Sequence, residues 1–164
     1  MKKLLLYFVI TVSVCGIGSC TLQVKTNTPG KVRNGIEITE NGLHAQQAFL
    51  LKDDGTLISD DNKIQVGERV LLRLIIDGWE EKNGAVFPEA SEKIATNTGV
   101  VFLNEPALFS ASLPDGTTLE NAKAITLYAT ITRLEKLYDY FLVSFKAWDK
   151  STNKSLSGSY KLYI

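Results

Sequence analysis

Histidine and cysteine are nearly absent from this sequence. His44 is the only histidine, and both cysteines, Cys15 and Cys20, fall within the first 20 of 164 residues. Catalysis by a Ser-His-Asp or Cys-His arrangement needs a positioned imidazole, which only His44 could supply. His44 follows the turn signal Asn41-Gly42, so we interpret it as a solvated strand residue. Beyond Cys20 we expect no disulfide and no thiolate metal site, and zinc would need His44 together with several carboxylates.

Long hydrophobic runs are missing too. Residues 4–14 form an apolar segment of eleven residues, which as a helix rises only about 16 Å against a hydrocarbon core of roughly 30 Å. Lys2 and Lys3 precede it, and small residues follow it before Cys20. This order of basic, apolar and small residues is that of a secretory signal peptide. We therefore predict a cleaved signal at residues 1–19 rather than a transmembrane anchor.

An excess of charge of either sign is also lacking. The chain has 18 Lys and Arg against 18 Asp and Glu, and the predicted cleavage removes Lys2 and Lys3, leaving about −2. A nucleic-acid-binding protein needs a basic stripe, and no such stripe is visible here. We expect no nucleic-acid partner and no cofactor.

The segment Ile17-Gly18-Ser19-Cys20 resembles the lipobox of bacterial lipoproteins, in which a branched apolar residue and two small residues precede the modified cysteine. The resemblance implies a diacylglyceryl thioether on Cys20, signal removal and usually a third acyl chain. Two or more chains anchor a protein stably in a membrane. Cys15 is the rival site, but Val14 would then occupy the cleavage position. Thr21 follows the cysteine in place of the aspartate that retains some lipoproteins at the inner membrane, which favours the outer membrane.

The mature chain divides into a polar tether and one domain. Residues 20–35 carry Pro29, Gly30 and Gly35 and predict a tether, with a short strand at residues 22–25 as an option. Hydrophobicity then recurs with period two, which predicts strands. The expected strands are residues 36–39, 43–52, 64–66, 69–77, 100–103, 124–132, 140–148 and 158–164, of which residues 100–103 are expected to be a short buried run.

Several segments give more specific predictions. Asn41-Gly42 indicates a hairpin between the first two strands. In residues 69–77 one face carries Val70, Leu72, Leu74 and Ile76 and the other carries Leu71 and Ile75, which indicates a central strand covered on both sides. In residues 140–148 the expected core face carries Phe141, Val143, Phe145 and Ala147. Residues 87–95 fit a helical turn through Glu89 and Glu92 or a strand with Ala90, Glu92 and Ile94 on one face, and we favour the strand. Short strands without a long amphipathic helix predict an all-β fold, an antiparallel sandwich of about seven to nine strands in residues 36–164.

The segments GERVLLRLIIDGW, GVVF and FLVSFKAWDKSTNKSLSGSYKLYI look like those of small immunoglobulin-like sandwiches of exported bacterial proteins. The resemblance spans residues 43–164. It implies a fold and carries no catalytic residue with it.

Acidic residues provide two candidate sites. The first is a pair of turns around Gly55 whose oxygen ligands would suit calcium: Asp53, Asp54, Asp60, Asp61 and Asn62. These residue types are also preferred in turns, and the EF-hand spacing is absent, so we predict no metal site. The second is a possible carboxylate pair for glycoside hydrolysis, drawn from Glu80, Glu81, Glu89, Glu92, Glu105 and Asp115.

Aromatic residues are the stronger binding candidates. Trp79 follows Asp77-Gly78 at the end of the strand at residues 69–77, Trp148 is out of phase with its strand's core residues, and Tyr128 lies on a threonine-lined face. Exposed rings on a sheet stack on sugars or anchor protein partners. We expect one tryptophan to be exposed, Trp148 rather than Trp79. The alternative is that Trp79 closes the core and the tyrosines lie flat on a sheet.

These patterns favour a lipid-anchored binding or accessory module of the cell envelope without catalytic activity, with a protein or glycan partner. The alternative is a structural subunit of an envelope assembly, and a carboxylate-based hydrolase comes last.

Overall fold

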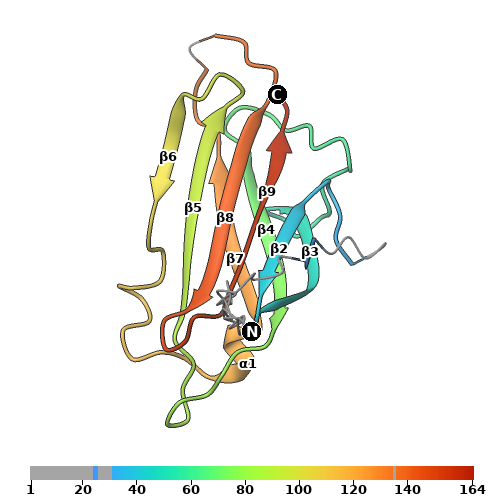
Figure 1. Cartoon of the computed structure of the whole chain (residues 1–164). Helices are drawn as coiled ribbons and strands as arrows, with labels where there is room; N and C mark the ends of the chain where they lie inside the picture. The colour runs from blue at the N-terminus through green and yellow to red at the C-terminus, as the bar shows by residue number, and fades with distance from the viewer. Residues whose placement is uncertain (1–23, 26–30, 135) are drawn as a thin grey trace, which may run out of the picture.

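The computed structural model describes residues 24–25, 31–134 and 136–164. The predicted signal peptide, Cys20 and most of the expected tether lie outside these residues. Within them the regular secondary structure is almost all strand, with one short helix (Figure 1). In chain order the elements are β1 (Val24–Lys25), β2 (Glu37–Asn41), β3 (His44–Lys52), β4 (Arg69–Asp77), β5 (Pro88–Thr96), β6 (Val101–Glu105), α1 (Leu119–Ala122), β7 (Ala124–Thr130), β8 (Phe141–Asp149) and β9 (Ser155–Leu162).

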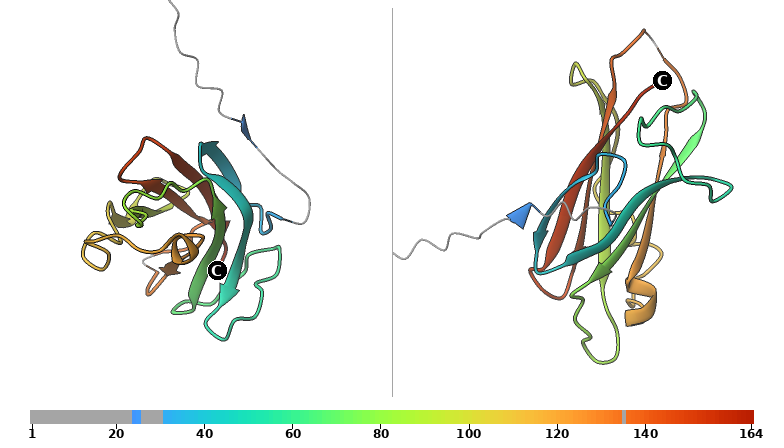
Figure 2. Two further views of the ribbon diagram at one scale, coloured as in Figure 1. Left: turned by 90° about the horizontal axis from the view of Figure 1, so that it is seen from below. Right: turned by 90° about the vertical axis from the view of Figure 1, so that its right-hand side faces the viewer.

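The strands form two sheets that face each other as two layers, which the right-hand view of Figure 2 shows from the side. One sheet has the order β1-β2-β9-β8-β5-β6 and the other the order β3-β4-β7. Every pair of neighbouring strands is antiparallel. The predicted antiparallel all-β sandwich is therefore confirmed.

The core lies between the sheets and follows the predicted strand phases. On β4 the inward side chains are fully buried: Val70, Leu72, Leu74 and Ile76. On the facing sheet the inward side chains of β8 are also buried: Phe141, Val143, Phe145 and Ala147. Strand alternation in the sequence thus identified the core side of both central strands.

The turn at Asn41-Gly42 does not make a hairpin. β2 pairs with β9, whereas β3 pairs with β4 in the other sheet, so the chain crosses between layers at this point. Gly42 has a φ of 77° and forms an isolated bridge with Ser155. An Asn-Gly pair supplies the left-handed backbone of a sharp turn, but it does not determine whether the next strand stays in the same sheet.

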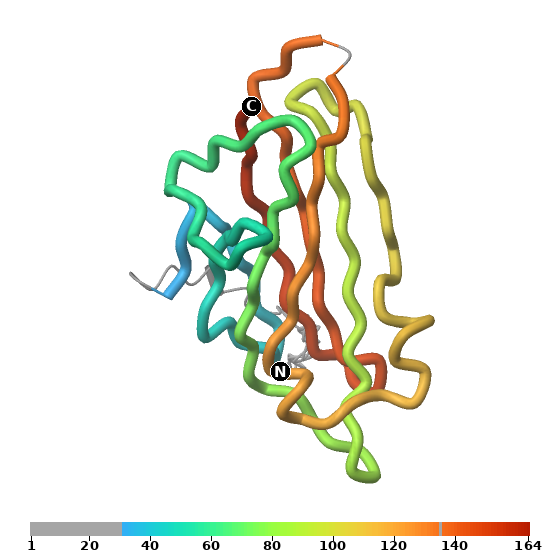
Figure 3. Tube along the Cα trace, turned by 180° about the vertical axis from the view of Figure 1, so that it is seen from behind, coloured from blue at the N-terminus to red at the C-terminus, as the bar shows by residue number. Residues whose placement is uncertain are grey.

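β4 is central, as predicted, but it is not covered on both sides. It runs between β3 and β7, and Figure 3 shows β4 and β7 from their outer side. Leu71 and Ile75 point outward and are only half-buried. Antiparallel sandwiches commonly leave the outer face of each sheet to solvent.

The run at residues 100–103 was expected to be buried, and here too the prediction is wrong. β6 is the edge strand of the six-stranded sheet, and Val100 and Val101 are 47% and 49% exposed. The ambiguous segment at residues 87–95 is a strand, β5, as favoured. Its inward residues include Ala90, Glu92 and Ile94, all buried.

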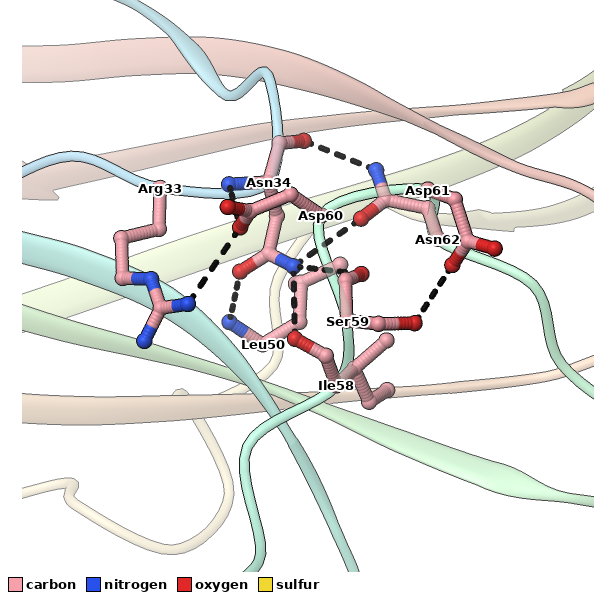
Figure 4. Close-up of polar contacts among 8 residues, drawn as sticks. All are labelled: Arg33, Asn34, Leu50, Ile58, Ser59, Asp60, Asp61 and Asn62. Carbon is pink, nitrogen blue, oxygen red and sulfur yellow. Dashed lines mark hydrogen bonds and ion pairs between the residues drawn. The ribbon is translucent and has the colours of Figure 1, made fainter.

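The folded domain begins before Ile36, inside the expected tether. Val32 bridges Ala48, and Asn34, 2% exposed, adopts a φ of 58°. Figure 4 shows the Asn34 side chain in contact with the segment around Asn62. The Asn34 amide nitrogen donates to the carbonyl of Ile58 at 3.1 Å and to Asn62 Oδ1 at 3.0 Å, and its oxygen accepts from the Leu50 amide at 3.0 Å. The polar composition of residues 20–35 predicted a tether. The hydrogen-bond partners of Asn34 are distant in sequence, so the local pattern did not reveal that this residue belongs to the folded domain.

Asn34→Ala is expected to lower the free energy of unfolding by about 2 kcal/mol, because it leaves buried backbone groups without partners. Asn83→Ala is the matched control, since Asn83 is exposed and also has a positive φ of 54°. It should cost less than about 1 kcal/mol. Urea unfolding measures both, and equal losses would show that backbone strain rather than the buried bonds explains the effect.

Candidate functional site

The three aromatic residues predicted to bind a partner do not share a surface. Trp79 is buried in the core at 7% exposure, so its ring is not available to a partner. It follows Gly78, whose φ of 97° turns the chain at the end of β4. Tyr128 is 53% exposed on the outer side of β7, with the Arg69 guanidinium carbon 5.8 Å from its ring centre. Trp148 belongs to β8 in the other sheet and is half-buried.

Trp148 lies on the outer face of the six-stranded sheet. The strand register places it between Glu89 of β5 and Ser155 of β9. The Lys146 ammonium, two residues earlier on β8, is 5.5 Å from the centre of its ring. Trp148 points outward because Phe145 and Ala147 point into the core and successive strand residues alternate.

Small hydroxyl and lysine side chains surround Trp148 on this face. The same register aligns the outward positions of β5, β8 and β9 in rows. We call this surface the serine–lysine face and define it by Ser91, Lys93, Ser144, Lys146, Trp148, Ser155, Ser157, Ser159 and Lys161. Sequence analysis missed its serines, although the alternation of Ser155, Ser157 and Ser159 with Leu156 and Tyr160 was readable.

Aromatic rings also close the opposite end of the serine–lysine face. Tyr140 precedes β8 and Tyr163 follows β9, with their ring centres 6.4 Å apart. The Lys161 ammonium is 4.3 Å from the centre of the Tyr140 ring. Each end of the face therefore has an aromatic ring with a lysine ammonium beside it, and the ring and the cation attract each other in this geometry.

A shallow hollow of about 370 Å³ lies within this face. It is lined by residues of β5, β6 and β8 and by Pro106 after β6: Ser91, Glu92, Lys93, Asn104, Ser144, Phe145 and Lys146. Lys93 stands opposite Ser144, and Lys146 stands opposite Ser91. The two lysines are thus diagonal neighbours across β5 and β8, and we call this depression the Lys93–Lys146 hollow.

The six candidate carboxylates do not converge. Glu80, Glu81, Glu105 and Asp115 are exposed, while Glu89 and Glu92 are buried. Because these last two belong to one strand and differ by an odd number of positions, Glu89 points to the outer side and Glu92 to the core. No pair is therefore placed on either side of a bond, as glycoside hydrolysis requires.

Glu89 has a structural environment. Burial alone would raise the pKa of its carboxyl, but hydrogen bonds from Ser110 and from the amides of Phe109 and Ala90 outweigh burial and lower it. The Phe109 amide lies 2.7 Å from Oε1, and the Lys150 ammonium lies 4.0 Å from Oε2. Glu89 therefore holds the segment after β6 against the sheet in its ionised form.

The acidic turns have local partners rather than a common centre. Asp53 faces Arg69 at 3.6 Å, and Asp60 faces Arg33 at 3.5 Å. Asp54 accepts hydrogen bonds from Thr56, and Asp61 accepts them from Ser59 and Lys63. In the described part of the chain, no three histidine, cysteine or acidic residues are grouped to hold a metal.

His44 is exposed at the start of β3, and its Nδ1 lies 3.0 Å from Glu40 Oε2. This contact is at the surface, where such pairs contribute little to stability.

Comparisons with models of protein families, with curated proteins and with solved structures found no match to this chain. Over the described residues, no helix has the length and apolar character needed to span a membrane.

Proposed function

We propose that this protein is a lipid-anchored binding module of the cell envelope without catalytic activity, and that it binds its partner through the serine–lysine face. The observation that carries the proposal is the outward, half-buried Trp148 ring with Lys146 beside it. An aromatic ring gives a large contact area at low entropic cost, and the surrounding serines supply hydrogen-bonding groups. Protein and glycan partners both fit this description.

The binding proposal is tested with the full chain extracted in detergent and mixed with insoluble cell-wall material. We expect the wild type to sediment with the wall fraction. Trp148→Ala should release most of it, whereas Tyr128→Ala, which removes a ring from the opposite sheet, should not. Equal sedimentation of both variants would contradict binding through the serine–lysine face.

A structural subunit of an envelope assembly is the second candidate. It is favoured by the outer face of the three-stranded sheet, where Leu51, Leu71 and Ile75 are half-buried beside the exposed ring of Tyr128. Apolar side chains left on one sheet face can pack against a permanent partner. A subunit of this kind should associate when purified alone, whereas a binding module should remain a monomer.

The membrane anchor is proposed from the lipobox resemblance, with Cys20 as the lipidated residue and the outer membrane as the location. Cys20→Ala is expected to abolish lipidation because the thioether requires the cysteine sulfur. The variant should then accumulate uncleaved or leave the membrane fraction. Mass spectrometry of the wild type checks the prediction: a mature protein that begins elsewhere, or an unmodified Cys20, contradicts it.

A further inference from the structure

We propose that the Lys93–Lys146 hollow binds the carboxylate of an acidic polysaccharide, while Trp148 stacks on a neighbouring sugar ring. This inference rests on the proposed function and specifies the class of ligand. It follows from three properties of the described part of this face: its lysines lack carboxylate partners, the hydroxyls of the hollow lack hydrogen-bond partners, and its strands β5, β8 and β9 carry none of the exposed large hydrophobic residues.

The two lysines of the hollow are close together and have no carboxylate partner among the described residues. Elsewhere Lys52, Lys150 and Lys154 each lie within 4.0 Å of a carboxylate oxygen. Among the residues that the structure describes, neither Lys93 nor Lys146 has such a partner, and both are exposed. Two neighbouring cations without counter-ions repel each other, and an anion placed between them removes that repulsion.

The acids near this face do not neutralise the hollow. Glu89 is buried on the same side but is occupied by Ser110, Phe109 and Lys150. Glu37 is exposed on β2, separated from Lys93 by the intervening strands β9 and β8. Glu92 also lines the hollow, but burial raises the pKa of its carboxyl to about 7, so that it is uncharged below this pH. Glu105 is exposed on β6 and stands opposite Glu92, on the other side of the strand from Asn104 and Lys93. With Glu92 protonated, the two lysines make the hollow positive, which favours an anionic ligand.

Neutral donors stand between the two lysines. Ser91 and Ser144 line the hollow, and Asn104 stands at its rim on the edge strand β6. Within the described ranges, none of these three side chains makes a hydrogen bond to another residue. A carboxylate accepts several hydrogen bonds at once, and bonds that include a charged partner are the stronger ones.

A polysaccharide fits this surface better than a lipid bilayer. The exposed large hydrophobic residues are Leu57, Val66, Val100, Val101, Tyr128, Leu137 and Ile164, and none of them lies on β5, β8 or β9. Peripheral binding to a bilayer depends on apolar side chains that enter the interface. An extended chain of sugars needs instead a flat face with hydroxyl groups and an aromatic ring, which this face provides.

The test measures binding of the full chain in detergent to polygalacturonate, to the neutral polymer pullulan, and to phosphatidylglycerol vesicles. We expect binding to polygalacturonate that weakens as salt rises, because screening reduces the attraction of exposed charges. The double substitution Lys93→Gln and Lys146→Gln should weaken it about tenfold or more, the size expected from losing charged hydrogen bonds. Trp148→Ala should weaken it as well.

The matched control is Lys63→Gln with Lys82→Gln, which removes the same charge from two exposed lysines outside the face. It should leave the affinity within about twofold, since net charge alone has a small effect at distance. Equal loss in both double variants, equal binding to pullulan, or binding to the vesicles alone would each overturn the inference. Wall binding that needs Trp148 but shows no preference for polygalacturonate would overturn this inference and leave the proposed function intact.

Discussion

Leu74→Ala and Phe145→Ala are each expected to lower the free energy of unfolding by about 2–5 kcal/mol, the range for large-to-small changes in a core. The two residues come from opposite sheets. Leu74 is fully buried between Ala48 and Ile125 on the neighbouring strands, and Phe145 is 4% exposed. Each substitution removes several methylene-sized groups and leaves a cavity that rigid strands cannot fully close.

Phe145 has a further reason to be sensitive to truncation. Gly158 stands opposite it on β9, and a Cβ built at Gly158 would lie 2.5 Å from the Phe145 ring. The ring therefore fills the space that the glycine leaves, and its centre lies 6.4 Å from that of Tyr160. Removing the ring leaves a void that neither Gly158 nor a backbone shift fills.

Thr130→Ala is the control for both core variants because Thr130 is exposed at the end of β7. It should change the free energy of unfolding by less than about 1 kcal/mol. Urea unfolding followed by tryptophan fluorescence measures all three, with the buried Trp79 reporting loss of the core. Equal losses for the three variants would mean that the assignment of inward and outward positions is wrong.

The sequence predicted the strands because alternation is a local property. The inward sets on β4, β7 and β8 were readable from a few neighbouring residues, and so was the outward position of Trp148. Strand pairing is not local, since β2 pairs with β9 from the far end of the chain. The Asn41-Gly42 turn therefore suggested a hairpin where the chain changes sheets.

The candidate site was only partly predictable for the same reason. Trp148 was identified from its phase, but Trp79 lies beyond the last residue of β4, where alternation no longer determines direction. The Lys93–Lys146 hollow depends on β5 lying beside β8, strands about 50 residues apart in sequence. Single lysines and serines in two distant segments give no pattern until the register brings them together.

Glu92 is the residue whose environment the sequence described least well. The sequence placed it on one face of a strand with Ala90 and Ile94 and among the candidate carboxylates, and the structure buries it at 3% exposure. In the described part of the chain, its Oε1 and the Tyr160 hydroxyl are buried without hydrogen-bond partners. Burial raises the pKa of Glu92 to about 7, and burial together with the Glu92 charge raises the pKa of Tyr160. A carboxyl in such a place is more stable with its proton.

The protein is therefore expected to lose stability as pH rises from about 4.5 to about 7, through the ionisation of Glu92. Below this pH window Glu92 is protonated in both the folded and the unfolded protein, so its ionisation does not affect stability. Within it the unfolded chain releases the proton while the folded chain keeps it, so ionisation favours unfolding. Above pH 7 the loss is complete and amounts to about 3 kcal/mol, the free-energy equivalent of the pKa difference.

Glu92→Gln keeps the shape of the side chain and removes its charge, so the variant should be up to about 3 kcal/mol more stable than the wild type at pH 8. Near pH 4 the two proteins should be nearly equal. Urea unfolding at several pH values measures the difference in stability between the variant and the wild type. Other groups such as Glu89 titrate in both proteins, so their contribution cancels in this difference. Glu105→Gln is the control, because Glu105 pairs with Glu92 across β5 and β6 but is exposed. A stability difference between Glu92→Gln and the wild type that does not change with pH would show that Glu92 is not a buried neutral acid in the folded protein.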